Sequence, residues 1–212
     1  MNKARVEALS DGVFAIVMTL LVIEIKVPET QTAMTGAELW QEICRIGPLF
    51  ASYALSYVVL AANWMTHHAL FHNLFKSVDR ITMLINLLFL GLLTIVPFSA
   101  HLVGTHPHVT AAVAFYGVNL LAIGLTGNLM FWYGSRQPEQ IQGVSPVILH
   151  QGAIRQAIFT GCTLLGVLAI WLSIPLALLL FGFPIVFNVV PGLLTLLERT
   201  VARASLRKRG GK

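Results

Sequence analysis

The chain has 212 residues, of which 56% are hydrophobic and 11% are charged. Soluble domains carry about 25% charged residues, so this composition excludes an ordinary soluble protein and indicates an all-α, polytopic membrane protein. The length leaves no room for a second, soluble domain. Cys44 and Cys162 lie far apart in apolar surroundings, which argues against a disulfide framework and a metal cluster.

The first apolar segment, residues 5–27, begins with ionisable residues. At about 1.5 Å per residue it is long enough to cross a bilayer, yet Ser10 and Asp11 stand near its start. Glu7 and Asp11 do not fit the basic region of a signal peptide, so we expect the segment to remain in the mature protein. An acid at this position needs a partner, and Asp11 therefore marks a candidate functional site.

Five further segments have the length and hydropathy of membrane spans. They cover about residues 47–71, 79–102, 109–133 and, within 154–199, two more. We expect a loop from Gly134 to Gln151, and a turn at Ser173-Ile174-Pro175 between the last two spans. A turn at Phe181-Gly182-Phe183-Pro184 is the alternative, although it shortens the last span. With the first choice, Pro184 and Pro191 are expected to kink the sixth helix.

Lysine and arginine are distributed unevenly among the predicted loops. With the N-terminus in the cytoplasm, twelve of the 14 basic residues face inside and only Lys26 and Arg45 face out. We therefore expect a protein of the cell (inner) membrane with both termini in the cytoplasm. It would consist of a six-helix domain over residues 1–200 and a basic tail over 201–212. The tail is interpreted as a topology signal, with anionic-lipid binding as the alternative.

The predicted outer loop between the first two spans is acidic. Its carboxylates are Glu24, Glu29, Glu38 and Glu42. They would concentrate cations at the outer mouth of a pore. They also fit a loop that is merely polar, and the sequence leaves the two interpretations open.

A narrow apolar stripe runs along the first segment. At helical spacing it consists of Gly12, Ile16, Leu20, Ile23 and Val27, and Thr19 flanks it. The stripe fits ordinary packing against a neighbouring helix, or a hydrophobic ring that closes a pore by dewetting. Asp11 lies about 140° from Ile16 around the helix, so we expect it to face helices of its own subunit.

Polar residues of the second and third segments fall at the depth of Asp11. The topology predicts one hydrogen-bonded cluster of Arg5, Ser10, Asp11, Asn63, Trp64, His67, His68 and Asn86. Indole and imidazole N–H groups can donate to the Asp11 carboxylate, and the Arg5 guanidinium can pair with it. Such a cluster would lock the first helix against the second and third.

Two other functions use the same residues. A proton-coupled secondary transporter would use Asp11 with His67 and His68 as a proton relay. A membrane enzyme would use His67, His68 and His72 as metal ligands. The other histidines form no second box, and GxSxG, HExxH and P-loop motifs are absent from the sequence. We therefore expect no enzyme, no cofactor and no bound metal.

The first segment also resembles a family signature. Arg5-x-x-x-Leu9-Ser10-Asp11 is similar to the Arg-x-x-x-Phe-Ser-Asp motif that opens the first helix of the transmembrane protein 175 family of potassium channels, in its bacterial and archaeal branch. The later residues that fit the same pattern are Trp64, His67-His68 and Phe71, then Asp79, Asn86 and Pro97-Phe98. Leu9 stands where the family usually has Phe, which keeps an apolar side chain.

The resemblance implies a homotetrameric, potassium-preferring cation channel whose pore is lined by four copies of the first helix. Family members lack the Thr-Val-Gly-Tyr-Gly carbonyl filter, and that sequence is absent here too. Ile16 maps to the narrowest hydrophobic ring, with Leu20 and Ile23 above it, and Thr19 maps to a hydroxyl associated with selectivity. The network residues map to Arg5, Ser10, Asp11, Trp64, His67, His68 and Asn86. The expected partners are further copies of the chain, membrane lipid and permeant K⁺, with no nucleic acid.

Overall fold

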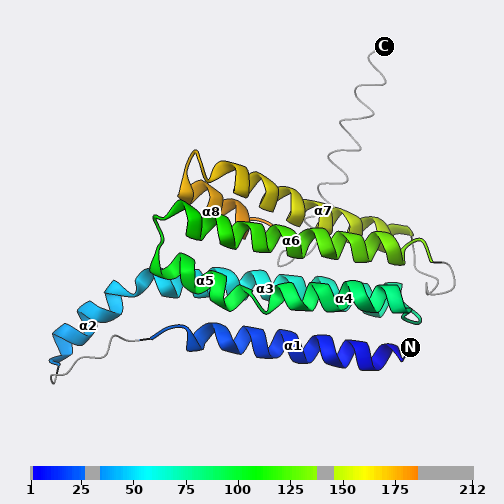
Figure 1. Cartoon of the computed structure of the whole chain (residues 1–212), viewed down its shortest axis with the longest axis horizontal. Coiled ribbons are helices and arrows are strands. Elements are labelled where there is room, and N and C mark those ends of the chain that lie inside the picture. Colours follow the sequence, from blue (N-terminus) through cyan, green and yellow to red (C-terminus); the bar gives the residue numbers. More distant parts are fainter. Residues whose placement is uncertain (1, 27–33, 138–145, 186–212) are drawn as a thin grey trace, which may run out of the picture.

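The computed structural model describes residues 2–26, 34–137 and 146–185, and all its regular elements within these ranges are helices (Figure 1). Five candidate membrane spans are present among them. They are α1 (Lys3–Ile23), α3 (Gly47–Leu74), α4 (Arg80–Leu93) together with α5 (Val96–Thr105), α6 (Thr110–Gly134) and, within α7 (Pro146–Ala169), the part from His150 to Ala169. Two shorter helices are α2 (Gly36–Arg45) and α8 (Ile174–Gly182). The predicted all-α, multi-pass class is therefore confirmed.

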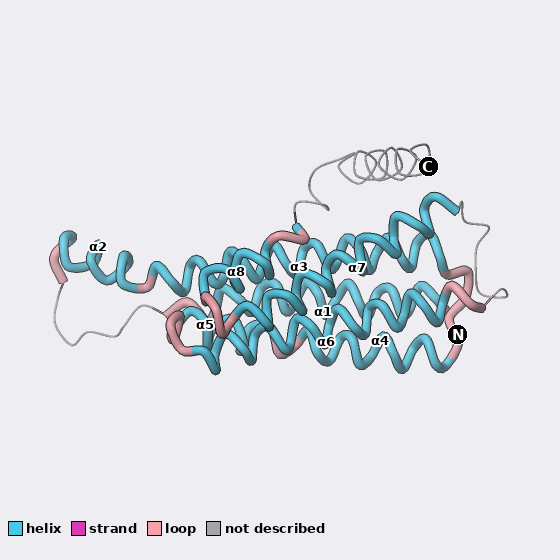
Figure 2. Tube along the Cα trace, turned by 90° about the horizontal axis from the view of Figure 1, so that it is seen from above, coloured by secondary structure: helices cyan, strands magenta, loops and turns pink. Residues whose placement is uncertain are grey.

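The long helices run along one common axis (Figure 2). In Figure 1, α1 forms one layer, α3 with α4 and α5 forms the next, and α6, α7 and α8 form the third. Helix α1 packs against α3, α4 and α5. The core between these layers is made of large apolar side chains, among them Phe14, Leu21, Leu60, Phe71, Phe89 and Leu93. One hydrophobic core thus joins α1 to the rest of the bundle.

The first helix is shifted from its predicted bounds. It begins at Lys3 because the Asn2 side chain accepts a hydrogen bond from the Ala4 amide at 3.0 Å, which caps the first turn. It ends at Ile23, with Glu24 as the C-cap. Val27, the last residue of the predicted stripe, lies outside the described residues.

The third predicted span is not one continuous helix. Helix α4 ends at Leu93 and α5 begins at Val96, with Pro97 in its first turn. Proline has no amide hydrogen to donate to the carbonyl of Leu93, so the α-helical hydrogen-bond ladder is interrupted there. The Thr94 hydroxyl donates to the Gly91 carbonyl at 2.7 Å and satisfies one backbone acceptor at the break. The predicted span over about 79–102 is confirmed as the candidate span Arg80–Thr105, which this break divides into two helices.

The predicted loop from Gly134 to Gln151 is too long at its C-terminal end. Helix α7 begins at Pro146, because proline suits the first helical position and apolar residues follow it in the sequence. The predicted turn near Ser173 is confirmed, since Ser173 is the extended N-cap of α8 and Pro175 lies in its first turn. The sixth span and the tail from residue 201 lie mostly or wholly outside the described residues.

The last described helix ends next to Pro184, one of the two prolines expected to kink the sixth helix. Helix α8 ends at Gly182, and Phe183 and Pro184 form a turn. The chain reverses between α7 and α8, near Ser173, and Phe183 keeps αR backbone angles, so the alternative turn at Phe181–Pro184 is not confirmed. The proline nitrogen cannot donate to the carbonyl of Leu180, which explains why the helix ends just before it. Pro191 lies outside the described residues.

Close packing of α6, α7 and α8 depends on glycines around Phe181, a fully buried residue of α8. A Cβ at Gly166 on α7 would lie 2.5 Å from the Phe181 ring, and a Cβ at Gly117 on α6 would lie equally close. These glycines leave the space that the ring fills. The chain offers a control on the same helix, because a Cβ at Gly161 would have no neighbour within 4 Å.

We expect Gly166→Ala to lower stability by about 1–3 kcal/mol, because the added methyl group overpacks the Phe181 site. Gly161→Ala is expected to raise stability by about 0.5–1 kcal/mol, since alanine is the better helix former and the site is open. Thermal unfolding of the purified variants in one detergent measures both changes. Equal melting temperatures for the two variants would contradict the packing argument.

The segment between α1 and α3 contains a helix that the sequence interpretation missed. Helix α2 begins with a capping box, in which the side chains of Thr35 and Glu38 each accept a hydrogen bond from the backbone amide of the other residue. Glu38 Oε2 accepts hydrogen bonds from the Thr35 amide at 2.7 Å and from the Thr35 hydroxyl at 2.9 Å. The signal was present as Thr-x-x-Glu before a helical run.

Acidification is expected to loosen the first turn of α2. The Thr35 amide, and then the Thr35 hydroxyl, lower the pKa of Glu38 below its ordinary value. The capping contribution is therefore complete above the ordinary glutamate pKa and is lost as pH falls through the lowered pKa. Amide hydrogen exchange in the first turn, compared between neutral and acidic solution, measures this. Thr35→Ala should remove the pH dependence, and protection that is unchanged in acid would contradict the expectation.

Candidate pore-lining surface on the first helix

Helix α1 has two distinct apolar faces. Its buried face, which packs on α3, α4 and α5, consists of Val6, Ser10, Phe14, Val17 and Leu21. The predicted stripe lies about 120° away around the helix. Ile16 and Ile23 are each 60% exposed and Leu20 is 40% exposed. Packing within this chain therefore does not cover the stripe among the described residues.

Gly12 and Thr19 lie on the same exposed side of α1. A Cβ at Gly12 would have no neighbour within 4 Å, so this end of the stripe is open. The Thr19 hydroxyl donates to the Ile16 carbonyl at 2.7 Å. Its proton is therefore engaged within the helix, and its oxygen keeps lone pairs that can accept from water or approach a cation.

A buried polar network ties the buried face of α1 to the bundle. The Asn86 amide donates to Ser10 Oγ at 3.0 Å, and Asn86 Oδ1 lies 2.8 Å from His67 Nε2. Ser10 in turn donates to the Val6 carbonyl at 2.9 Å. Ser10 and Asn86 are fully buried and His67 is 5% exposed. The network thus joins α1, α3 and α4 at a single depth.

Aromatic rings surround His67 in this network. The ring stacks on Phe71 with centroids 4.5 Å apart and on Phe89 at 5.4 Å, and Phe14 lies at 5.7 Å. Its Nε2 is directed to Asn86, so the hydrogen on that nitrogen belongs to the Asn86 contact. The three rings enclose the imidazole, so His67 has a structural role in the core.

Asp11 belongs to a second, separate contact. The Trp64 indole donates to Asp11 Oδ1 at 2.9 Å, and the Trp64 ring stacks on His68 with centroids 5.5 Å apart. Asp11 therefore faces α3 of its own chain, as predicted. The prediction of one continuous cluster is wrong, because Ser10 and Asp11 point to different partners on adjacent sides of α1.

Two expected members lie outside both contacts. Asn63 donates to the Val59 carbonyl of its own helix at 2.9 Å. Arg5 is exposed, and no ion pair between it and Asp11 is found among the described residues. Asp11 already accepts from Trp64, so its carboxylate has a neutral donor in place of the expected guanidinium.

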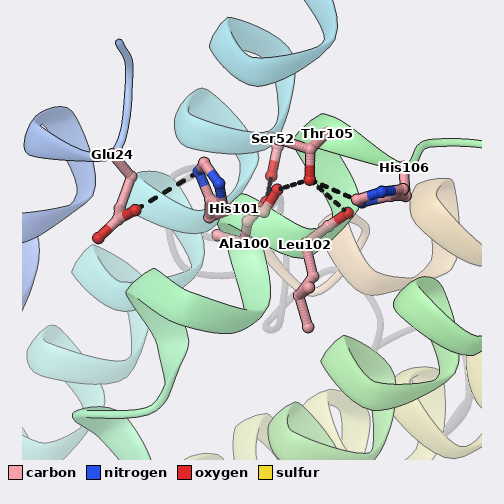
Figure 3. Close-up of polar contacts among 7 residues, drawn as sticks. All are labelled: Glu24, Ser52, Ala100, His101, Leu102, Thr105 and His106. Carbon is pink, nitrogen blue, oxygen red and sulfur yellow. Dashed lines mark hydrogen bonds and ion pairs between the residues drawn. The ribbon is translucent and has the colours of Figure 1, made fainter.

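The sequence interpretation missed a contact at the other end of α1. Glu24, the C-cap of α1, lies 3.4 Å from Nδ1 of His101 on α5, which is an ion-pair distance without hydrogen-bond geometry (Figure 3). The Ser52 hydroxyl donates to the adjacent Ala100 carbonyl and joins α3 to α5 there. No local motif pairs these residues, since only the packing of α5 on α1 brings them together.

The histidines of α3 do not form a metal site in the structure. His67 faces the buried network, whereas His68 and His72 stack on each other at the exposed side with centroids 6.0 Å apart. In the described part of the chain, no group of three or more His, Cys, Asp or Glu side chains could hold a metal ion.

Comparison with known proteins places these residues in a family context. Residues 5–97, which contain the stripe and both polar contacts, match the family model described as the endosomal/lysosomal potassium channel TMEM175. A Streptomyces collinus protein named as a potassium channel is 36% identical over 143 residues, or 64% of this chain and 66% of that protein. The matches to this protein and two other bacterial potassium channels span 59–66% of their lengths.

Two further matches extend the comparison. The crystal structure of a lysosomal potassium-selective channel TMEM175 homolog from Chamaesiphon minutus superposes with a TM-score of 0.76 and 28% identity. That match covers 87% of this chain and 95% of the other. A Gallus gallus protein named endosomal/lysosomal proton channel TMEM175 is 35% identical over 107 residues, covering 48% of this chain and 21% of that protein.

Proposed function

Because the chain belongs to the TMEM175 family, a family of ion channels and not of enzymes, we propose that it is a potassium-preferring cation channel. The observation that carries the proposal is the uncharged stripe on α1, which the chain leaves exposed while it anchors the opposite face with a buried polar network. In a homotetramer, four such stripes would line the pore around the symmetry axis.

Rings of isoleucine and leucine act as the gate in this proposal. Ile16, Leu20 and Ile23 would form three successive constrictions, about 6 Å and about 4.5 Å apart along the helix. A narrow ring of this kind dewets and stops conduction, and tilting or rotation of α1 would widen it. Apolar rings offer no oxygen to replace a hydration shell, so K⁺ would pass partly hydrated. Selectivity would be modest, with the Thr19 oxygen as an accepting group beside the ring.

The polar contacts would hold the pore helix in position. The network of Ser10, Asn86 and His67 anchors the inner face of α1, and the Asp11–Trp64 contact anchors the adjoining side. We propose that Arg5 and His68 contribute from the edge of this region. Any change in the tilt of α1 must alter one of the two contacts, so they would set the balance between the closed and open pore.

The orientation follows the distribution of charge. The basic residues Lys3, Arg5, Lys76, Arg80 and Arg136 lie at the end of the bundle that carries the N-terminus (Figure 1). This end would face the cytoplasm of a cell whose inner membrane holds the six-span domain, residues 1–200, and the tail from 201 would follow on the same side. Glu24, Glu38 and Glu42 at the other end would attract cations to the outer mouth.

Ion flux into liposomes tests the proposal. The purified chain is reconstituted, and K⁺ and H⁺ entry are measured separately under defined gradients. A potassium channel gives rapid K⁺ flux that does not saturate with concentration and does not require a proton gradient. Saturable flux that depends on protons would instead support the carrier with Asp11, His67 and His68. Absence of flux for both ions would contradict a channel.

Proton conduction is the second candidate function. It is favoured by one observation, the name of the vertebrate relative as a proton channel. The same liposomes distinguish the two, because a proton channel acidifies the lumen at a rate that does not depend on K⁺.

A further inference from the structure

A cavity of about 150 Å³ lies between α3, α6 and α7, away from the α1 surface. It is partly open to the outside, and most of its lining is apolar, with Leu70 and Leu74 of α3 facing Phe131 of α6. The cavity is formed by the last turns of α3 and α6 and the first turns of α7, which meet at the end of the bundle that carries the N-terminus (Figure 1). An apolar wall at this depth fits a hydrocarbon chain.

Arg155 of α7 brings a charge into this apolar cavity. Its Nε is buried and has no hydrogen-bond partner, and no carboxylate of the described residues forms an ion pair with it. A guanidinium stays charged at any physiological pH. Arg155 is half-buried as a residue, so its charge is partly removed from water, and an anion at the cavity would compensate this loss. Arg136, at the same end, differs because it lies over the Trp132 ring, 4.3 Å from its centroid.

Neutral amides surround Arg155 in the cavity wall. Gln156 is 9% exposed, and its amide fits where Gly127 has no side chain, 2.7 Å from the position a Cβ would take. Asn73 donates one amide hydrogen to the Ala69 carbonyl at 2.9 Å, and the second hydrogen of the same amide remains as a donor. Gln151 completes the polar side of the wall. One cation with several amides is the donor set that a phosphate group accepts from.

We propose that this cavity binds one anionic phospholipid from the leaflet on the N-terminal side of the bundle. Its phosphate would accept hydrogen bonds from Arg155, and its glycerol and first acyl carbons would lie along Leu70, Leu74 and Phe131. Arg155 stands five residues inside the span that begins at His150, and a long side chain there reaches towards the headgroup region. The predominantly apolar wall selects an amphiphile over a free anion, and basic pockets between helices are known lipid headgroup sites.

Lipid binding to the purified full-length chain tests the proposal. The protein is placed in neutral detergent, and binding of phosphatidylglycerol and of phosphatidylcholine is measured by native mass spectrometry. We expect one phosphatidylglycerol to bind preferentially to the wild type. Arg155→Gln should weaken it about tenfold or more, which corresponds to about 1.4 kcal/mol, while Arg155→Lys should retain part of the preference. Inorganic phosphate should not compete at matched concentration.

Two further variants distinguish lipid binding in the cavity from a general electrostatic attraction between the lipid and the basic end of the bundle. Arg136→Gln removes a charge at the same end without touching the cavity, and it should leave binding unchanged. Ala69→Phe fills the cavity but keeps Arg155, and it should abolish binding even if Arg155→Gln does not fold. The proposal is overturned by equal losses for Arg136→Gln and Arg155→Gln, by unchanged binding to Ala69→Phe, or by competition from inorganic phosphate. The readout is lipid binding, so it does not depend on whether the chain conducts.

Discussion

Ile16→Asn is expected to produce a leaky pore, with faster K⁺ flux and a lower preference for K⁺ over Na⁺. Ile16 is 60% exposed in the isolated chain and lies at the centre of the α1 stripe. In the tetramer, four amide groups would replace four apolar side chains, and water would then remain in the constriction. If this lowers the barrier by about 1.4 kcal/mol, flux rises about tenfold. Fluorescent K⁺ and Na⁺ flux assays in liposomes measure both changes.

Val22→Asn is the matched control for this prediction. Val22 is on the same helix and 51% exposed, but it lies about 120° from Ile16 around the helix axis. The Val22→Asn variant should fold and insert as well as Ile16→Asn does. It should leave the rate of K⁺ flux and the preference for K⁺ over Na⁺ at their wild-type values. If the two variants leak equally, the stripe is not the constriction. If Ile16→Asn conducts like the wild type, the ring does not limit flux.

The periodic features of the fold could be predicted from the sequence. The span positions follow from hydropathy, and the stripe on α1 follows from helical spacing alone. The break at Thr94 and Ile95 and the early start of α7 at Pro146 were missed because hydropathy averages over many residues. A proline changes the backbone hydrogen bonds of only one turn, so it leaves little trace in such an average.

Most members of the polar region could also be predicted, although Arg5 and Asn63 lie outside it, but the pairing of the members could not. Ser10 and Asp11 are adjacent in sequence, yet a rotation of about 100° per residue directs them to Asn86 and Trp64 respectively. Only the packed positions of α3 and α4 decide which donor each side chain meets. The Glu24–His101 contact and the cavity at Arg155 also depend on helices that are distant in sequence, so no local sequence pattern predicts them.

The buried network around Asn86 gives a large expected effect on stability. Asn86→Leu removes the acceptor of His67 Nε2, and His67 is buried among the rings of Phe14, Phe71 and Phe89. An unsatisfied buried polar group costs about 1–3 kcal/mol. For a chain of this size, each kcal/mol lowers the melting temperature by roughly 2–4 °C. Asn63→Leu is the control, since among the described residues this buried amide bonds within its own helix, and its loss should matter less.

A double variant separates the lost hydrogen bond from a general packing defect. In His67→Phe with Asn86→Leu both partners are apolar, and the new ring occupies a site already lined by Phe14, Phe71 and Phe89. Replacing both partners avoids the unsatisfied group, so the double variant should be more stable than the sum of the single changes predicts, by about 0.5–3 kcal/mol. Thermal unfolding in a single detergent gives the coupling. Simple additivity would mean that the His67–Asn86 hydrogen bond does not couple α3 to α4, because both side chains would then act only through their volume.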